Sequence, residues 1–156
     1  MSSTPPFRPR ALGEIAIRCN DIDRMAEFYE TIIGLIPLQP RGDSGIQFYK
    51  IGEGFEGHTS VLALFDYRTN SPRPGLHPQS DAGPIAGAGS SLHHIALSLP
   101  FAEQDQVIAW YEEINQPYRI EHFNWIGWRG IFTQDPEGNT VELVAFDQSL
   151  LDQASG

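Results

Sequence analysis

Residues 13–19 read Gly-Glu-Ile-Ala-Ile-Arg-Cys, and residues 93–99 read His-His-Ile-Ala-Leu-Ser-Leu. In both stretches apolar side chains alternate with polar or small ones, which is the pattern of a strand with one buried face. Ile95 and Leu97 therefore share one face of the second strand, and His94 lies on the other. The two stretches begin the two halves of an internal repeat.

Each opening strand leads into a helical pattern. The first helix is predicted over about residues 22–32, capped by Asn20 or Asp21 and ended by Gly34. The second is predicted over about residues 101–114. Three short strands follow each helix, near Ile36–Gln39, Ile46–Ile51 and Ser60–Phe65, and near Tyr118–His122, Gly130–Thr133 and Asn139–Phe146. The fold class is therefore α+β, with two tandem βαβββ modules.

The repeat also predicts how the chain is divided. Module one covers about residues 11–66, module two about 92–147, and residues 148–156 form a C-terminal tail. Between the modules, residues 67–91 are rich in Pro, Gly and Ser, which is typical of a linker. One module with a half-covered sheet cannot easily bury its own apolar face, so we expect residues 1–156 to form a single domain.

Composition limits the classes of partner. The chain has 20 acidic and 10 basic residues, a formal net charge of −10, so nucleic acid is not an expected partner. No apolar run reaches the length of a membrane span, and the N-terminus lacks a signal-peptide pattern. We therefore expect a cytoplasmic protein that binds a small molecule and not a membrane. Cys19 is the single cysteine, so no internal disulfide can form.

Three stretches carry a family resemblance. Residues 14–35 contain a strand, a helix with a Phe-Tyr pair and a Gly-Leu exit, and residues 92–97 contain a second opening strand. Residues 135–143 read Asp-Pro-Glu-Gly-Asn-Thr-Val-Glu-Leu. In this order they resemble the vicinal oxygen chelate superfamily, which includes glyoxalases, bleomycin-resistance proteins and extradiol dioxygenases. The resemblance implies two modules curled into a cupped, incomplete barrel, and a homodimer is one expectation by family analogy.

The resemblance also implies a metal site inside the barrel, held by the first and last strands of each module. The corresponding positions are Glu14, Leu62, His94 and Glu142, at a constant offset (94 − 14 = 80 and 142 − 62 = 80). Leu62 cannot ligate, which leaves one imidazole and two carboxylates for a divalent ion: Fe, Mn, Zn, Ni or Mg. Alternatively no metal binds, and His94 is hydrogen-bonded to Glu142. His93 is predicted to point away, into packing or the surface.

Further residues are candidates for binding a substrate. Arg18 shares the polar face of the first strand, where it either binds an anion or pairs with Glu14. An aromatic and basic cluster precedes a later strand and could wall a pocket for a planar or anionic ligand. The substrate-binding candidates are Arg18, Trp125, Trp128, Arg129 and Phe132.

The function favoured by these features is a metal-dependent, glyoxalase-like lyase or isomerase acting on a small substrate with vicinal oxygens. Glu14 and Glu142 are the predicted catalytic residues, and a Glu14 that does not ligate could serve as a general base. Phe132 occupies the position where ring-cleaving dioxygenases of this superfamily usually have a tyrosine, which counts against that alternative. The other alternative is a metal-free protein that sequesters a ligand, as bleomycin-resistance proteins do.

Overall fold

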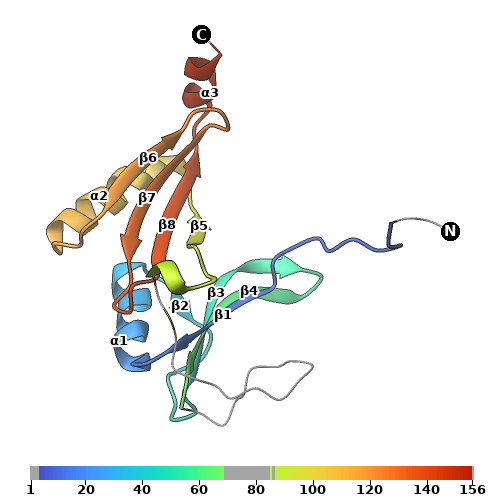
Figure 1. The fold of residues 1–156 in the computed structure, drawn as a ribbon, viewed down its shortest axis with the longest axis vertical. Helices are drawn as coiled ribbons and strands as arrows, with labels where there is room; N and C mark the ends of the chain where they lie inside the picture. Colours follow the sequence, from blue (N-terminus) through green and yellow to red (C-terminus); the bar gives the residue numbers. More distant parts are fainter. Residues whose placement is uncertain (1–3, 69–84, 86, 156) are drawn as a thin grey trace. The chain divides into compact units, whose positions relative to one another are not determined.

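The computed structural model describes residues 4–68, 85 and 87–155. The chain divides into two compact units, with the division between residues 84 and 85. We call them module one and module two, and Figure 1 shows the elements of each. Each module is described by itself, so the single domain and the cupped barrel expected from the sequence stay predictions.

Module one is one helix on a four-stranded sheet. The strand order is β1-β4-β3-β2, with β1 parallel to β4 and the other pairs antiparallel. Its elements are β1 (Glu14–Cys19), α1 (Ile22–Glu27), the π-helical turn η1 (Phe28–Ile32), β2 (Ile36–Pro37), β3 (Ile46–Phe55) and β4 (His58–Asp66).

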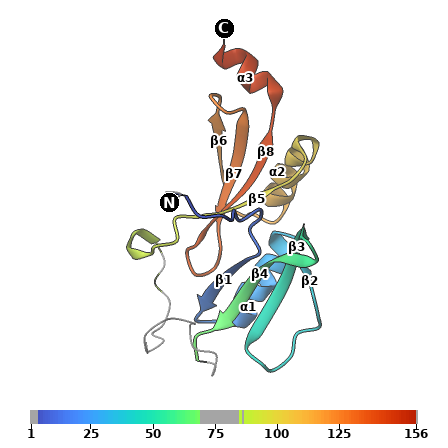
Figure 2. The same cartoon turned by 90° about the vertical axis from the view of Figure 1, so that its right-hand side faces the viewer.

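Module two repeats the plan with the strand order β5-β8-β7-β6, again with its first and last strands parallel. Figure 2 shows α2 lying against its sheet. Its elements are η2 (Gly87–Gly89), β5 (Ile95–Ser98), η3 (Phe101–Glu103), α2 (Gln104–Glu113), β6 (Arg119–Phe123), β7 (Trp128–Gln134), β8 (Thr140–Phe146) and α3 (Gln148–Ala154).

The helix of module one covers the sheet face that carries Leu62. Tyr49 donates a hydrogen bond to Glu30 of η1 (2.9 Å), which places the Tyr49 side chain on the helix side. Tyr49 pairs with Leu62, and directly paired residues point to the same face. Leu62, Tyr49 and Met25 of α1 are all buried, so this face holds the core of the module.

The helix of module two covers the equivalent face of its own sheet. The buried Gln104 of α2 accepts a hydrogen bond from Arg129 Nε (2.6 Å), so the Arg129 side chain lies on the helix side. Ile131 shares that face by strand alternation, and Leu143 shares it because it pairs with Ile131. Both are buried against the helix side.

The structure confirms the predicted α+β class and the two tandem βαβββ modules. Asp21 caps the first helix, and Gly34 (φ 86°) follows it in the left-handed region, as predicted. The predicted C-terminal tail, residues 148–156, contains α3 (Gln148–Ala154), which is capped by the Asp147 side chain. Most of the predicted linker, residues 69–84 and 86, lies outside the described residues. Within the described part of the chain, every helix is too short or too polar to span a membrane.

Candidate functional site

Four residues of module two form one row across its sheet and face away from α2. Their pairing in register runs Ala96–Glu142–Phe132–Arg119, from β5 through β8 and β7 to β6. The row lies opposite to the helix side because Glu142 alternates with the helix-facing Leu143. We call the sheet face that carries this row the site face.

Glu142 and His94 meet on the site face. His94 directly precedes β5, and its Nε2 lies 3.2 Å from Glu142 Oε2. The side chain of Glu142 is 6% exposed and that of His94 is 32% exposed. A carboxylate buried to this degree needs a cation, a hydrogen-bond donor or a metal ion as its partner. The contact is compatible with a shared metal ion and with a direct hydrogen bond, so it leaves both sequence interpretations open.

The environment of Glu142 opposes its negative charge. Burial raises the pKa of the Glu142 carboxyl, while the charge of His94 and its hydrogen bond pull the pKa down. Burial is the larger effect. The ionised carboxylate is therefore held in a place that favours an additional positive charge beside it.

Gly130 provides the space that the Glu142 carboxylate occupies. A Cβ atom at this position would clash with Glu142 Oε1 and would stand 2.8 Å from Phe132 Cε2. Gly130 lies on β7 within the site face, two residues before Phe132. Only glycine leaves this position free for the carboxylate, so Gly130 belongs to the site although sequence reasoning did not select it. A glycine inside a predicted strand is a signal of such close approach.

Aromatic rings and a second histidine surround His94. The ring of Phe132 lies 6.0 Å from the His94 ring, and Phe123 lies 6.4 Å from Phe132, both nearly edge to face. The Nδ1 atoms of His93 and His94 are 2.7 Å apart. His93 is exposed, which is one of the two alternatives predicted for it, but its ring contacts that of His94, so the prediction that it points away from His94 is wrong.

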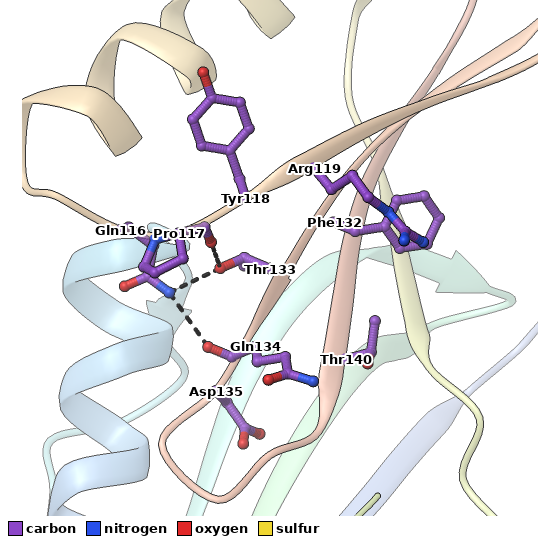
Figure 3. Close-up of a pocket in the computed structure, with 9 residues that line it drawn as sticks. All are labelled: Gln116, Pro117, Tyr118, Arg119, Phe132, Thr133, Gln134, Asp135 and Thr140. Atoms are coloured by element: carbon purple, nitrogen blue, oxygen red, sulfur yellow. Dashed lines mark hydrogen bonds between the residues drawn. The ribbon is translucent and has the colours of Figure 1, made fainter. Parts of the chain in front are cut away.

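A groove of about 610 Å³ begins beside Phe132 (Figure 3). It extends along the end of β7 and the segment that leads into β6. In that segment Gln116 donates hydrogen bonds to Thr133 Oγ1 (2.7 Å) and to the Gln134 carbonyl (3.3 Å). Its cation is Arg119, which contacts Glu121 at 3.0 Å. The lining residues are Gln116, Pro117, Tyr118, Arg119, Phe132, Thr133, Gln134, Asp135 and Thr140.

The Asp-Pro-Glu-Gly-Asn motif builds the turn at the end of this groove. Asp135 is buried, and its Oδ1 accepts hydrogen bonds from the backbone N–H groups of Glu137 (2.9 Å) and Asn139 (3.0 Å). Its Oδ2 accepts from the Asn139 side chain (2.8 Å). Both oxygens of this carboxylate are therefore occupied by the turn, and the motif orients β7 and β8 so that Phe132 lies opposite Glu142.

The structure separates the predicted aromatic and basic cluster. Trp128 lies on the site face and is 44% exposed, while Trp125 in the β6–β7 turn is 76% exposed. Arg129 lies on the opposite, helix-covered face. Its guanidinium contacts Gln104 and Asp105 and stacks 4.7 Å above the Phe101 ring. Arg129 therefore anchors the start of α2, and the structure does not bring it to the site face.

Module one places Glu14 and Arg18 on the face opposite to its helix, together with Ala63. Glu14 is exposed and Arg18 is half-buried. The predicted fourth metal position, Leu62, is wrong by one residue. Ile15 pairs with Leu62 as Ile95 pairs with Val141, so Ala63 is the counterpart of Glu142.

The constant offset of 80 residues therefore does not extend to the last strands. Leu62 is 1% exposed and faces α1. Neither leucine nor alanine can ligate, so the conclusion that this position gives no ligand is unchanged. In the part of the chain that the structure describes, no group of three or more His, Cys, Asp or Glu side chains is arranged to hold a metal ion. The third ligand, Glu14, stays a prediction.

The chain resembles known proteins at the level of family and fold. One solved structure, lactoylglutathione lyase from Agrobacterium tumefaciens, is 23% identical, with 88% of this chain and 94% of that chain covered and a TM-score of 0.62. Fosfomycin resistance protein FosX from Mesorhizobium loti is 16% identical, with coverages of 96% and 100% and a TM-score of 0.59. The trypanothione-dependent glyoxalase I from Leishmania major is 21% identical, with 94% of each chain covered and a TM-score of 0.53.

These identities show the fold and not the activity. No curated protein matches the chain. The family model described as Glyoxalase/Bleomycin resistance protein/Dioxygenase superfamily matches residues 11–143, which includes both modules. This chain therefore belongs to the Glyoxalase/Bleomycin resistance protein/Dioxygenase superfamily.

Proposed function

We propose that this protein is a metal-dependent enzyme of glyoxalase-like type, a lyase or isomerase that acts on a small substrate with two neighbouring oxygen atoms. The observation that supports the proposal is the approach of His94 Nε2 to Glu142 Oε2 at 3.2 Å on the site face, where the Glu142 side chain is only 6% exposed. Two donor atoms that each lie about 2.1 Å from one ion, at a right angle, are about 3 Å apart. The pair therefore has the spacing of two adjacent metal ligands.

The donor types fit a divalent cation. A neutral imidazole and a carboxylate together suit Zn, Fe, Mn or Ni, and a further carboxylate would shift the preference toward the harder ions. Burial of Glu142 adds to this fit, because an ion beside it would offset the cost of its buried charge. We propose Glu14 as a third ligand on the basis of its position in the sequence.

A metal ion at this site would supply Lewis acidity to two adjacent substrate oxygens. The residues of the chain would hold and orient the substrate. Phe132 has no hydroxyl group, so it can pack against a substrate but cannot donate a proton to one. This favours a lyase or isomerase over a ring-cleaving dioxygenase. The groove beside Phe132 has space for the part of the substrate that does not react.

The main alternative is a metal-free binding protein. Its supporting observation is the exposure of Trp125 and Trp128, since exposed indole rings are common in sites that stack planar ligands. In that case His94 and Glu142 form a plain hydrogen bond, and an aromatic ligand lies against the tryptophans.

Metal analysis tests the proposal. Protein purified without chelator should contain about one divalent ion per chain, and titration of the metal-free protein with Zn²⁺ should show one site that is lost in Glu142→Gln. Glu121→Gln is the matched control, because Glu121 lies on the site face and pairs with Gly130 but is half-exposed. The metal-free binding protein would be supported instead if the wild-type protein does not bind Zn²⁺ and planar aromatic ligands quench its tryptophan fluorescence.

A further inference from the structure

We propose that His93 is a positioning residue: its Nδ1 holds the His94 ring so that Nε2 faces Glu142, and the direction of the hydrogen bond between the two histidines reverses when a metal ion binds. The reversal of the hydrogen bond rests on the proposed metal site. The orientation of the His94 ring by His93 applies to the metal-free protein and depends only on the geometry of His93, His94 and Glu142.

Both ring nitrogens of His94 have partners, and the two partners lie on opposite sides of the ring. Nδ1 lies 2.7 Å from His93 Nδ1, and Nε2 lies 3.2 Å from Glu142 Oε2. The two imidazole rings are inclined at 68°, with their centres 5.0 Å apart. A rotation of the His94 ring about its Cβ–Cγ bond would break both contacts together, so the two partners fix one ring orientation.

When both histidine rings are neutral and Glu142 is ionised, the two contacts of His94 allow one arrangement of protons. A carboxylate only accepts hydrogen bonds, so His94 Nε2 must carry the proton that it donates. In a neutral ring Nδ1 is then bare and must accept. His93 therefore donates from its own Nδ1, and the Nε2 atom of this exposed residue is bare.

A metal ion on His94 Nε2 requires the opposite arrangement. The proton on Nε2 leaves to solvent, because a ligating nitrogen must be bare. The proton between the histidines moves from His93 Nδ1 to His94 Nδ1, which now donates, and His93 Nε2 takes a proton from solvent. Two ring protons are present before and after, so the pair changes tautomers without a net gain or loss.

Residue 93 must therefore supply an atom that can both donate and accept at the Nδ1 position. The amide of asparagine meets this need, since its Oδ1 or Nδ2 can occupy the place of histidine Nδ1. Leucine has a similar size and offers neither. The comparison of His93→Asn with His93→Leu therefore separates the hydrogen bond from simple packing.

The test uses the full chain with ¹⁵N-labelled histidine. Long-range ¹H–¹⁵N NMR spectra report the tautomer of each histidine in the metal-free protein and after addition of Zn²⁺, and calorimetry measures the Zn²⁺ affinity. His122→Leu is the matched control, because His122 is another exposed histidine of module two and lies on the face opposite to the site.

We expect His94 to be the Nε2–H tautomer without metal and the Nδ1–H tautomer with Zn²⁺, with His93 changing in the same step. His93→Leu should mix the His94 tautomers and weaken Zn²⁺ binding by about tenfold or more, the usual effect of losing a hydrogen bond to a ligating histidine. His93→Asn should restore most of the affinity, and His122→Leu should change neither readout.

Two results would overturn the role of His93. One is a single, unchanged His94 tautomer in His93→Leu, and the other is a Zn²⁺ affinity that is the same in wild type, His93→Leu and His93→Asn. If wild-type protein binds no Zn²⁺, the proposed function fails, and the metal-free tautomers still decide whether His93 orients His94.

Discussion

The two modules have nearly the same row of residues on the sheet face opposite to their helices, and they differ where the site lies. At the three positions compared, both rows contain an alanine on the first strand and a phenylalanine on the third, and they differ on the last strand; Arg119, the fourth residue of the module-two row, is left out of the comparison. The rows are Ala16–Ala63–Phe48 in module one and Ala96–Glu142–Phe132 in module two. The same scaffold thus offers an inert methyl group in one half and a buried carboxylate in the other.

A second difference accompanies the first. Gly130 pairs with Val144 in module two, and the equivalent residue in module one is Ile46, which pairs with Phe65. Glycine leaves room beside Glu142, because a Cβ at this position would force the carboxylate to move from its observed place. Module one has no carboxylate at Ala63 and accommodates the isoleucine. A buried glutamate on one strand therefore depends on empty space on its neighbour, and the two residues act as a pair.

The largest effect is expected at Leu62, which the sequence pattern placed at the metal site and the structure places against α1, one residue before the counterpart of Glu142. Leu62→Ala should destabilise the protein by about 2–5 kcal/mol, because Leu62 is buried against α1. The Zn²⁺ affinity should not change. Denaturant unfolding measures the stability, and calorimetry measures the Zn²⁺ affinity. Ile36→Ala is the control, because Ile36 is 72% exposed. A folded Leu62→His that gains Zn²⁺ affinity would instead place residue 62 at the metal site.

Gly130→Ala should produce the next largest effect. The new methyl group displaces the Glu142 carboxylate, which should cost about 1–3 kcal/mol of stability. It should also weaken Zn²⁺ binding, since Glu142 Oε2 would leave its place beside His94.

A double-mutant cycle isolates this clash. In the background of Glu142→Ala the obstructed carboxylate is gone, so Gly130→Ala should lose the part of its cost that comes from Glu142 and keep the part that comes from the close contact with Phe132 Cε2. Additive effects of the two substitutions on unfolding would show that Gly130 and Glu142 are independent.

Arg129 and Phe132 are three residues apart on β7 but lie on opposite faces of its sheet. Arg129→Ala should destabilise the protein by about 1–3 kcal/mol, because a hydrogen bond to the buried Gln104 is lost with the stacking on Phe101. It should leave Zn²⁺ and ligand binding unchanged. Phe132→Ala should change ligand binding, and equal losses of binding in both variants would contradict the separation of the two faces.

The smallest expected effect is a pH dependence. In metal-free protein the folded-state pKa of Glu142 lies above its ordinary value of 4.5, with burial as the main cause. The folded state therefore binds more protons between the two pKa values, and stability should fall as pH rises through that window. Glu142→Gln should remove the decrease in stability that comes from ionisation of Glu142. Chemical unfolding at several pH values measures this, and parallel pH–stability curves for wild type and variant would contradict the prediction.

The fold could be predicted from the sequence because its signals are local and repeated. Alternation, caps and turns specify each strand and helix, and Asp21 and Gly34 act where the sequence places them. The mutual approach of His94 and Glu142 follows from the phases of two strands. Arg129 could not be placed in this way, since an arginine beside two tryptophans carries no sign of the helix that covers it.

Other features needed coordinates because they depend on pairing between distant strands. The register of β1 with β4 moves the counterpart of Glu142 from Leu62 to Ala63, a shift of one residue that reverses the face. The role of Gly130 depends on where a side chain of the next strand lies. The contact between His93 and His94 needed coordinates because His93 lies two residues before β5, where alternation no longer fixes the direction of its side chain.

We propose that His94 Nε2 and Glu142 Oε2 bind the same metal ion. Anomalous diffraction at the zinc absorption edge, from crystals of the wild-type protein grown with Zn²⁺, tests it most directly. We expect a peak about 2.1 Å from both atoms, and the map would also show whether Glu14 binds the same ion. A map with no peak there, and with His94 still hydrogen-bonded directly to Glu142, would rule out this metal site.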